Sequence, residues 1–200
     1  MIYVTLTTVP DRLNLTESIQ KNINSLLTQD TTEPYKVVIN IPYSYKNYDE
    51  VLVPEWLLAL ADTSEKLIIL RDTSDYGPIT NLIYPLKFIP MDAEDLLIVC
   101  DDDHEYEPTM IYWHLKKLEK YTGNHAICFR GNGPIELRTW YENDKKLAKF
   151  WASGVLFPTD RDIYLKLPDH WHSVSYRRRF FQDDIFDESF LSMSWENDVL

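Results

Sequence analysis

Three consecutive aspartates, Asp101, Asp102 and Asp103, directly follow the apolar run at residues 96–100. Such a run is typical of a strand buried on both faces, in a parallel sheet covered by helices. If strand pairing continues to its end, Asp101 and Asp103 point to one side, with Cα atoms roughly 6.5 Å apart. Two like charges this close require a cation or a shared proton. Because ligands bind at the carboxyl ends of strands in open α/β sheets, the triplet predicts a divalent-metal site at that edge.

The alternative for the triplet is a solvated acidic turn, the more common origin of acidic clusters in an acidic protein. Its place directly after a buried strand favours a site, because folding alone does not require three aspartates there. Hard carboxylate oxygens suit Mn²⁺ or Mg²⁺, and such ions keep open positions for substrate phosphates.

Further charged residues also have two interpretations each. Arg12 and Arg71 follow predicted strand ends and would reach a phosphate or a base, although surface ion pairs are almost as common. The three arginines at residues 177–179 would clamp a diphosphate or form the commoner solvated turn. Asp183 and Asp184 would be a functional acidic pair, or carboxylates that interact favourably with a helix N-terminus.

The elements that must position these residues alternate between strand and helix. Strand patterns cover residues 2–7, 35–41, 67–70 and 96–100, and helical patterns follow them at 15–29, 55–61, 79–88 and 110–118. We expect a loop at 8–12, a capping box at Asn14 and Glu17, and Pro54 as a first helical residue. Pro85 is expected to kink or shorten its helix. The alternation predicts a mostly parallel α/β sheet with right-handed crossovers.

The pattern is less regular beyond residue 123. Short strands are predicted at 126–130, 147–151 and 155–157, a turn at 131–134 and a final helix at 183–193. No change in composition marks a linker, so residues 1–200 are expected to form a single domain. This domain would have a regular half at 1–123 and an irregular half at 124–200.

Composition limits the classes of function. The 200 residues carry a formal net charge of −12, which argues against a nucleic-acid binder that neutralises phosphates. A nucleotide ligand remains compatible, because a metal ion can supply positive charge locally. Cys100 and Cys128 lie in apolar runs and are predicted to be buried reduced thiols, which fits a cytosolic compartment. No apolar stretch approaches 18 residues, so no membrane span or signal peptide is expected.

Taken in order, these segments resemble nucleotide-sugar glycosyltransferases of the GT-A type. The resemblance lies in residues 7–12 (TTVPDR), residues 77–81 (GPITN) and the aspartate triplet. Downstream, residues 151–157 (WASGVLF) resemble the acceptor-side segment of that family, and residues 182–186 (QDDIF) its late acidic pair. Within the family, the chain is most similar to the small N-terminal domain of large chlorella-virus proteins that build capsid glycans. It would then be a domain excised from a longer protein that acts in the host cytosol.

The resemblance implies a GT-A fold, Rossmann-like, with a nucleotide-sugar and metal half followed by an acceptor-side half. It also implies contacts to the nucleotide sugar from a set of residues at the ends of the early strands: Thr8, Val9, Pro10, Arg12, Arg71, Tyr76, Gly77, Asn81, Asp101 and Asp102. Many relatives carry Lys where this chain has Asn81.

Roles in catalysis follow from the same resemblance. Asp103, with Asp101, would hold Mn²⁺ or Mg²⁺ against the two phosphates of a uridine diphosphate sugar. Trp151 and Gly154 would contact a glycan acceptor. Asp183 or Asp184 would take the proton of the acceptor hydroxyl in an inverting enzyme, or stabilise the oxocarbenium-like centre in a retaining one.

Two other classes of protein remain open. A nucleotidyltransferase also places carboxylates at strand ends, but such enzymes often carry a glycine-rich loop after the first strand, and residues 8–12 contain no glycine. The other class is a catalytically inactive module that binds a nucleotide or a sugar.

Overall fold

The structure is a computed structural model of residues 1–200. It describes the chain except for residues 46–47, 49, 122–124, 130, 133–154, 157–166, 169–172 and 194–200. All structural statements below concern the described residues.

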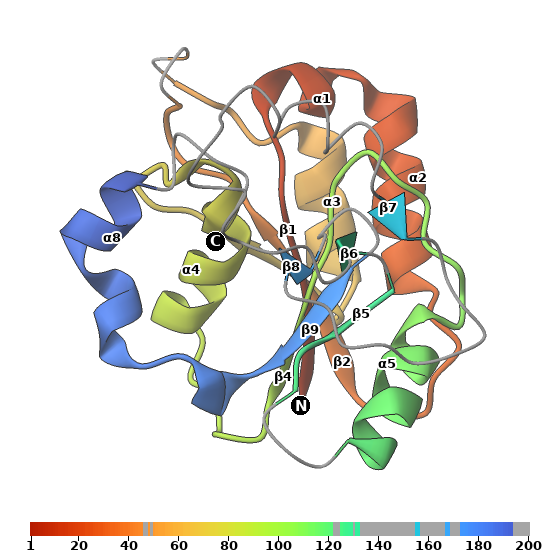
Figure 1. Ribbon diagram of the computed structural model, residues 1–200. Helices are drawn as coiled ribbons and strands as arrows, with labels where there is room; N and C mark the ends of the chain where they lie inside the picture. The colour runs from red at the N-terminus through yellow and green to blue at the C-terminus, as the bar shows by residue number, and fades with distance from the viewer. Residues whose placement is uncertain are drawn as a thin grey trace.

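A six-stranded sheet in the order β3-β2-β1-β4-β9-β5 forms the centre of the molecule (Figure 1). Its strands are β1 (Ile2–Thr7), β2 (Tyr35–Asn40), β3 (Leu67–Leu70), β4 (Leu96–Val99), β5 (Ile127–Cys128) and β9 (Val174–Arg177). The first four strands in chain order pair in parallel, whereas β9 is antiparallel to both β4 and β5. The predicted mostly parallel sheet is confirmed.

Helices cover both faces of this sheet, as Figure 1 shows. They are α1 (Pro10–Asn14), α2 (Thr16–Leu27), α3 (Glu55–Thr63), α4 (Thr80–Phe88), α5 (Met110–Lys120) and α8 (Glu188–Met193). Single-turn 3₁₀ helices are η1 (Gly77–Ile79), η3 (Arg178–Phe180) and η4 (Asp183–Phe186). The main apolar core joins α2, α3 and α5 to one face, and a second cluster joins α4 and η4 to the other.

Burial on both faces explains why the strands are apolar without alternation. In β4, Leu97 packs in the cluster with α4, whereas Ile98 packs in the cluster with α2 and α5, and both are fully buried. A strand between two helical layers has no solvent face, so it needs apolar residues at every position. Because β4 lies between β1 and β9 inside the sheet, its end and the aspartates after it lie near the centre of the sheet's carboxyl edge.

Several predicted boundaries were wrong for local reasons. Residues 8–12 are not simply a loop, because the ring of Pro10 suits the first position of a helix and α1 begins there. Asn14 therefore ends α1, Leu15 precedes α2, and no side chain caps that helix. Pro54 lies one position earlier than predicted, as the residue before α3. The helix that contains Pro85 ends at Phe88 as predicted, so the proline does not shorten it.

The second half differs more from its prediction. The predicted turn at 131–134 begins with a strand, β6 (Gly131–Asn132), which pairs with β7 (Val155–Leu156) and β8 (Leu167–Pro168) in a small antiparallel sheet. The predicted helix at 183–193 is divided into η4 and α8. The predicted strand at 147–151 lies outside the described residues. Cys100 is buried as predicted, whereas Cys128 is partly exposed, and neither forms a disulfide bond among the described residues. No helix in the described part of the chain is long and apolar enough to cross a membrane.

Candidate active site

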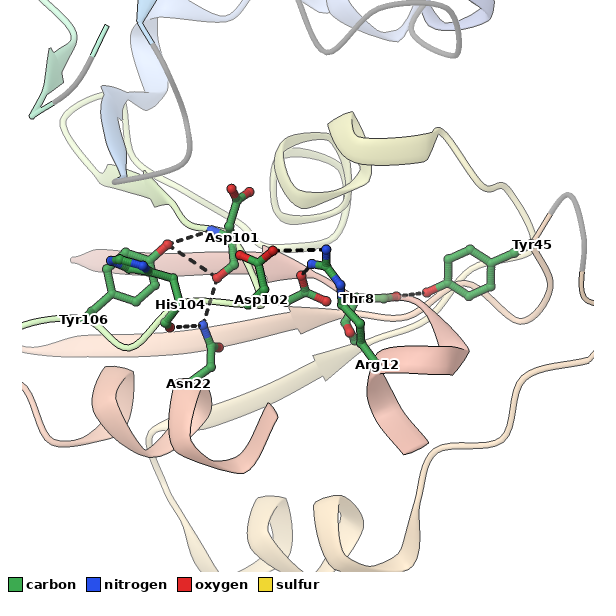
Figure 2. Close-up of polar contacts among 9 residues, drawn as sticks. Thr8, Arg12, Asn22, Tyr45, Asp101, Asp102, His104 and Tyr106 are labelled. Carbon is green, nitrogen blue, oxygen red and sulfur yellow. Dashed lines mark hydrogen bonds and ion pairs between the residues drawn. The ribbon is translucent and has the colours of Figure 1, made fainter. Parts of the chain in front are cut away.

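The aspartate triplet lies just beyond β4 rather than within it. The strand ends at Val99, and the ladder continues only to the amide of Cys100, which donates to the carbonyl of Thr5 at 2.8 Å. The strand alternation that would pair Asp101 with Asp103 therefore does not extend to these residues. Figure 2 shows the carboxylate of Asp102 pointing toward Arg12, whereas that of Asp101 points away from it.

A polar scaffold holds the backbone of the triplet in place (Figure 2). Asn22 of α2 is 1% exposed, and its side-chain amide donates to the carbonyls of Asp101 at 2.9 Å and His104 at 2.6 Å. The amide of Asp101 donates to the hydroxyl of Tyr106 at 2.7 Å. These contacts satisfy backbone groups that the end of the strand would otherwise leave unpaired. They define a turn that presents the three carboxylates.

Arg12 of α1 is the cation of this site. Its guanidinium pairs with Oδ1 of Asp102 and, through Nη2, with Oδ2 of Asp103 at 3.1 Å. The two carboxylates differ in environment, because the side chain of Asp102 is 5% exposed and that of Asp103 is 44% exposed. One arginine thus joins a buried carboxylate to a half-exposed one.

Burial sets the electrostatics of Asp102. It raises the pKa of this carboxyl above the ordinary value, although the hydroxyl of Thr8 and the charge of Arg12 act in the opposite direction. Burial alone would lower the pKa of Arg12, but the neighbouring carboxylates, Asp102 first, outweigh it and raise that pKa. Oδ2 of Asp102 and Oγ1 of Thr8 are both buried, and neither completes a well-formed hydrogen bond within the described chain. The site therefore retains buried polar atoms with bonding capacity to spare.

The segment between β1 and α1 forms one wall of the site. Thr8 is 2% exposed, and its carbonyl accepts a hydrogen bond from the hydroxyl of Tyr45. Burial is the largest cause that raises the pKa of Tyr45, so this phenol stays protonated and acts as a donor. Val9 is 41% exposed beside it, and Pro10 begins α1. The wall thus combines an anchored threonine with an exposed apolar residue.

The segment before α4 reaches the same edge of the sheet. The hydroxyl of Thr5 in β1 donates to the carbonyl of Asn81 at 2.6 Å and accepts from the side-chain amide of Asn40 at 2.8 Å. Gly77 has a φ of 61°, where a Cβ atom is disfavoured, and its amide donates to Asp75 at 2.9 Å. Tyr76 packs edge-on against Tyr84. The predicted residues Tyr76, Gly77 and Asn81 therefore stand at the carboxyl edge, with Asn81 held through its backbone.

Arg71 has structural partners in this molecule. Its guanidinium donates to the backbone carbonyls of Ile41, Pro42 and Val51 and lies 4.3 Å from the ring centre of Tyr43. It braces the segment that follows β2. Its contact with a phosphate or a base stays a prediction.

The arginines at 177–179 lie at the other end of β4. Since β9 is antiparallel, Arg177 pairs with Leu96, the first residue of β4. Arg177 and Arg179 both pair with Glu94, while the amide of Arg178 donates to the carbonyl of Asp95 at 2.9 Å. These contacts lie at the amino end of β4, so the structure does not bring the three arginines to the triplet, and instead of a solvated turn they form the end of β9 and η3.

Asp183 and Asp184 are exposed on η4. Their neighbours Ile185 and Phe186 pack in the clusters formed with α4, which fixes η4 against that helix. In Figure 1 the blue segment from β9 to α8 runs along the outer side of α4, away from the end of β4. The role of this pair at an acceptor hydroxyl stays a prediction. Trp151 and Gly154 lie outside the described residues.

The sequence analysis missed Asn22 and Tyr106, which position the triplet. A signal for Asn22 was present, because it lies on the apolar stripe of α2 between Ile19 and Ile23, where a polar residue requires a partner. Tyr106 had no comparable signal.

A hollow of about 570 Å³ also opens beside the triplet. It is lined by Leu15, Thr16, Glu17, Ser18, Lys21, Asp103, His104 and Glu105.

Comparison with protein families matches residues 13–186 to glycosyl transferase family 2, a range that includes the triplet. The chain belongs to this family. The chain has the predicted GT-A type fold, and its family sets the nucleotidyltransferase alternative aside. No match was found among curated proteins.

The fold is also found in solved structures. One similar structure is residues 1–349 of S. aureus TarS, with a TM-score of 0.51 and 11% sequence identity. The match covers 96% of this chain and 53% of that one, so the chain spans about half the length of the TarS structure. At this identity the likeness concerns the fold alone.

Proposed function

We propose that this glycosyltransferase moves a sugar from a uridine diphosphate donor to a carbohydrate hydroxyl, with the help of Mn²⁺ or Mg²⁺. One observation carries the proposal: three aspartates stand at the carboxyl edge of the sheet with one arginine paired to two of them. The carboxyl edge is where ligands bind in this class of sheet. A carboxylate cluster with an excess of negative charge is suited to a cation that a diphosphate brings with it.

The donor atoms of the site fit such an ion. Among the described residues, no group of three or more His, Cys, Asp or Glu side chains is placed to hold a metal ion by itself. Mg²⁺ does not need such a group, since it is commonly bound by one or two carboxylates and completed by waters and substrate phosphates. The half-exposed Asp103 would hold the ion on the open side of the triplet, and the family resemblance adds Asp101 as its second ligand. When bound, the ion supplies Lewis acidity that stabilises the departing diphosphate.

The donor nucleotide would lie along the same edge. We assign it to the wall formed by Thr8, Val9 and Pro10 and to the segment with Gly77 and Asn81 on the other side of β1. Val9 offers exposed apolar surface to a base. Gly77 allows a ligand to approach the backbone, because no side chain covers it. Asp102 would stay engaged with Arg12, as its burial requires.

On the acceptor side, we propose that Asp183 or Asp184 acts on the hydroxyl that attacks the sugar. Both carboxylates are exposed and precede a short helix. Trp151 and Gly154 would contact the glycan, and the second half of a single domain would hold it. The resemblance to chlorella-virus domains supports a role in capsid-glycan synthesis in a host cytosol.

Calorimetric titration with uridine diphosphate, with and without Mn²⁺, tests the proposal. We expect binding that depends on Mn²⁺ and weakens by at least about tenfold in Asp103→Ala, since about 1.4 kcal/mol of metal-mediated contact corresponds to that factor. Glu107→Ala is the matched control, because Glu107 is exposed and lies only four residues further along. Metal-independent binding that survives Asp103→Ala would overturn the metal site.

A further inference from the structure

Arg12 makes two contacts of unequal strength in one side chain. Its pair with Asp102 involves a carboxylate that is almost fully buried, so breaking it would leave a buried charge without compensation. Its pair with Asp103 joins two groups that are each more than 40% exposed. Exposed ion pairs contribute little, because water and salt screen them. The first contact is therefore durable and the second is readily exchanged.

The two aspartates also differ in how easily solutes can reach them. Asp103 lines the open hollow beside α2, so solutes can reach it. Asp102 lies below it, against Thr8, and is closed to solvent. A cation that arrives from solution meets Asp103 first and finds the guanidinium of Arg12 already there.

We propose that Arg12 is a tethered cation that competes with the divalent ion for Asp103 while Asp102 keeps it in place. This inference rests on the proposed function, since it concerns the same metal site. With no ion bound, Arg12 neutralises part of the triplet and prevents mutual repulsion of its carboxylates. When the ion arrives, the Nη2 donor leaves Asp103 and the Nη1 contact with Asp102 remains. The freed donor can then serve a phosphate oxygen, to which guanidinium groups bind well.

The proposal predicts effects of opposite sign for one substitution. Arg12→Gln removes the competitor, so Mn²⁺ alone should bind about two- to fivefold more tightly, the factor expected when an exposed ion pair no longer has to be broken. The same variant lacks the freed donor, so uridine diphosphate in the presence of saturating Mn²⁺ should bind about tenfold more weakly. A residue with only a structural role would weaken both or neither.

The experiment measures free Mn²⁺ by electron paramagnetic resonance during titration of the whole chain, and the nucleotide by calorimetry. Arg179→Gln is the matched control, because it removes the same charge at the other end of β4, where Arg177 still pairs with Glu94. Arg12→Lys keeps a charge beside Asp102 but cannot span both carboxylates, so it should fold and still bind Mn²⁺ more tightly than the wild type.

The outcomes separate this inference from the proposed function. Mn²⁺ affinity that is unchanged or reduced in both Arg12 variants would overturn the competition, even if Asp103→Ala abolishes Mn²⁺ binding. If neither the wild type nor Arg12→Gln binds Mn²⁺ alone, the competition is overturned, whereas the proposed function is overturned only if uridine diphosphate binds without need of Mn²⁺. If Arg12→Gln does not fold, the lysine variant alone decides the competition.

Discussion

The two ends of β4 carry charged clusters that are built differently. At the carboxyl end, three aspartates follow the strand and Arg12 pairs with two of them. At the amino end, Glu94 accepts from Arg177 and Arg179, and Asp95 pairs with the N-terminal ammonium at 2.7 Å. The second cluster holds at least as much positive as negative charge, and Glu94 is 64% exposed. The first has an excess of carboxylates, although each cluster contains one that is nearly buried, Asp102 in the first and Asp95 in the second.

The difference separates a structural cluster from a ligand site. Balanced, exposed ion pairs tie β9 to the start of β4, need no further partner and contribute little each. An unbalanced cluster with a buried carboxylate is costly unless a cation is present. The same strand thus has a cluster of acidic and basic groups at each end, and charge balance distinguishes their roles.

The largest expected effect concerns η4, which the chain reaches from the amino end of the sheet. We expect Asp183→Asn or Asp184→Asn to lower kcat by at least about 100-fold, the contribution of a general base, while donor binding changes only a few-fold. Initial rates of sugar transfer and calorimetry with the donor measure the two quantities. Glu94→Gln is the control, as an exposed carboxylate of the amino end, and should transfer at the wild-type rate. Wild-type rates in both aspartate variants would move the role of base elsewhere.

The next effect compares the two clusters by stability. Arg12→Ala should lower the free energy of unfolding by about 2 kcal/mol, below the range for fully buried pairs because Arg12 is 43% exposed. Arg179→Ala should lower it by less than about 0.5 kcal/mol, since its pair is exposed and Arg177 remains. Urea unfolding without metal gives both values. Equal losses in the two variants would contradict the distinction between the clusters.

Much of the regular half was predictable because its strands have no solvent face. The strands at Ile2–Thr7 and Leu67–Leu70 match their predicted bounds, since apolar and β-branched runs of that length have few alternatives. The position of the triplet at the carboxyl edge follows from β4 in the same way. The prediction failed where a single residue fits both a loop and a helix, as Pro10 does: a loop was predicted at 8–12, and α1 begins at Pro10.

The pairing inside the site could not be predicted from local pattern. Arg12 and Asp102 are 90 positions apart in the chain, and nothing in either segment specifies that the two side chains meet. Alternation along an assumed strand favoured Asp101 with Asp103, but the turn held by Asn22 gives Asp102 and Asp103 one shared partner. Asp183 and Asp184 were predicted to act on the acceptor hydroxyl by resemblance alone, and no local pattern could test that role.

The smallest effect concerns the start of β9, which is fixed by a buried histidine, whereas the end of this strand is fixed by ion pairs. His114 of α5 is fully buried, and its ring nitrogens lie 2.9 Å from the hydroxyl of Ser175 and 2.8 Å from that of Ser173. Burial lowers the pKa of His114 to about 3, so the unfolded chain binds its proton first. Protonation of the unfolded chain therefore lowers the free energy of unfolding as the pH falls from 6.5 toward 3, by up to about 1.4 kcal/mol per pH unit. Above pH 6.5 His114 causes no such loss. Unfolding of His114→Gln should show a shallower loss between pH 6.5 and 5 than the wild type, because acidic side chains contribute equally in both. Identical slopes would mean that His114 is already charged in the folded protein.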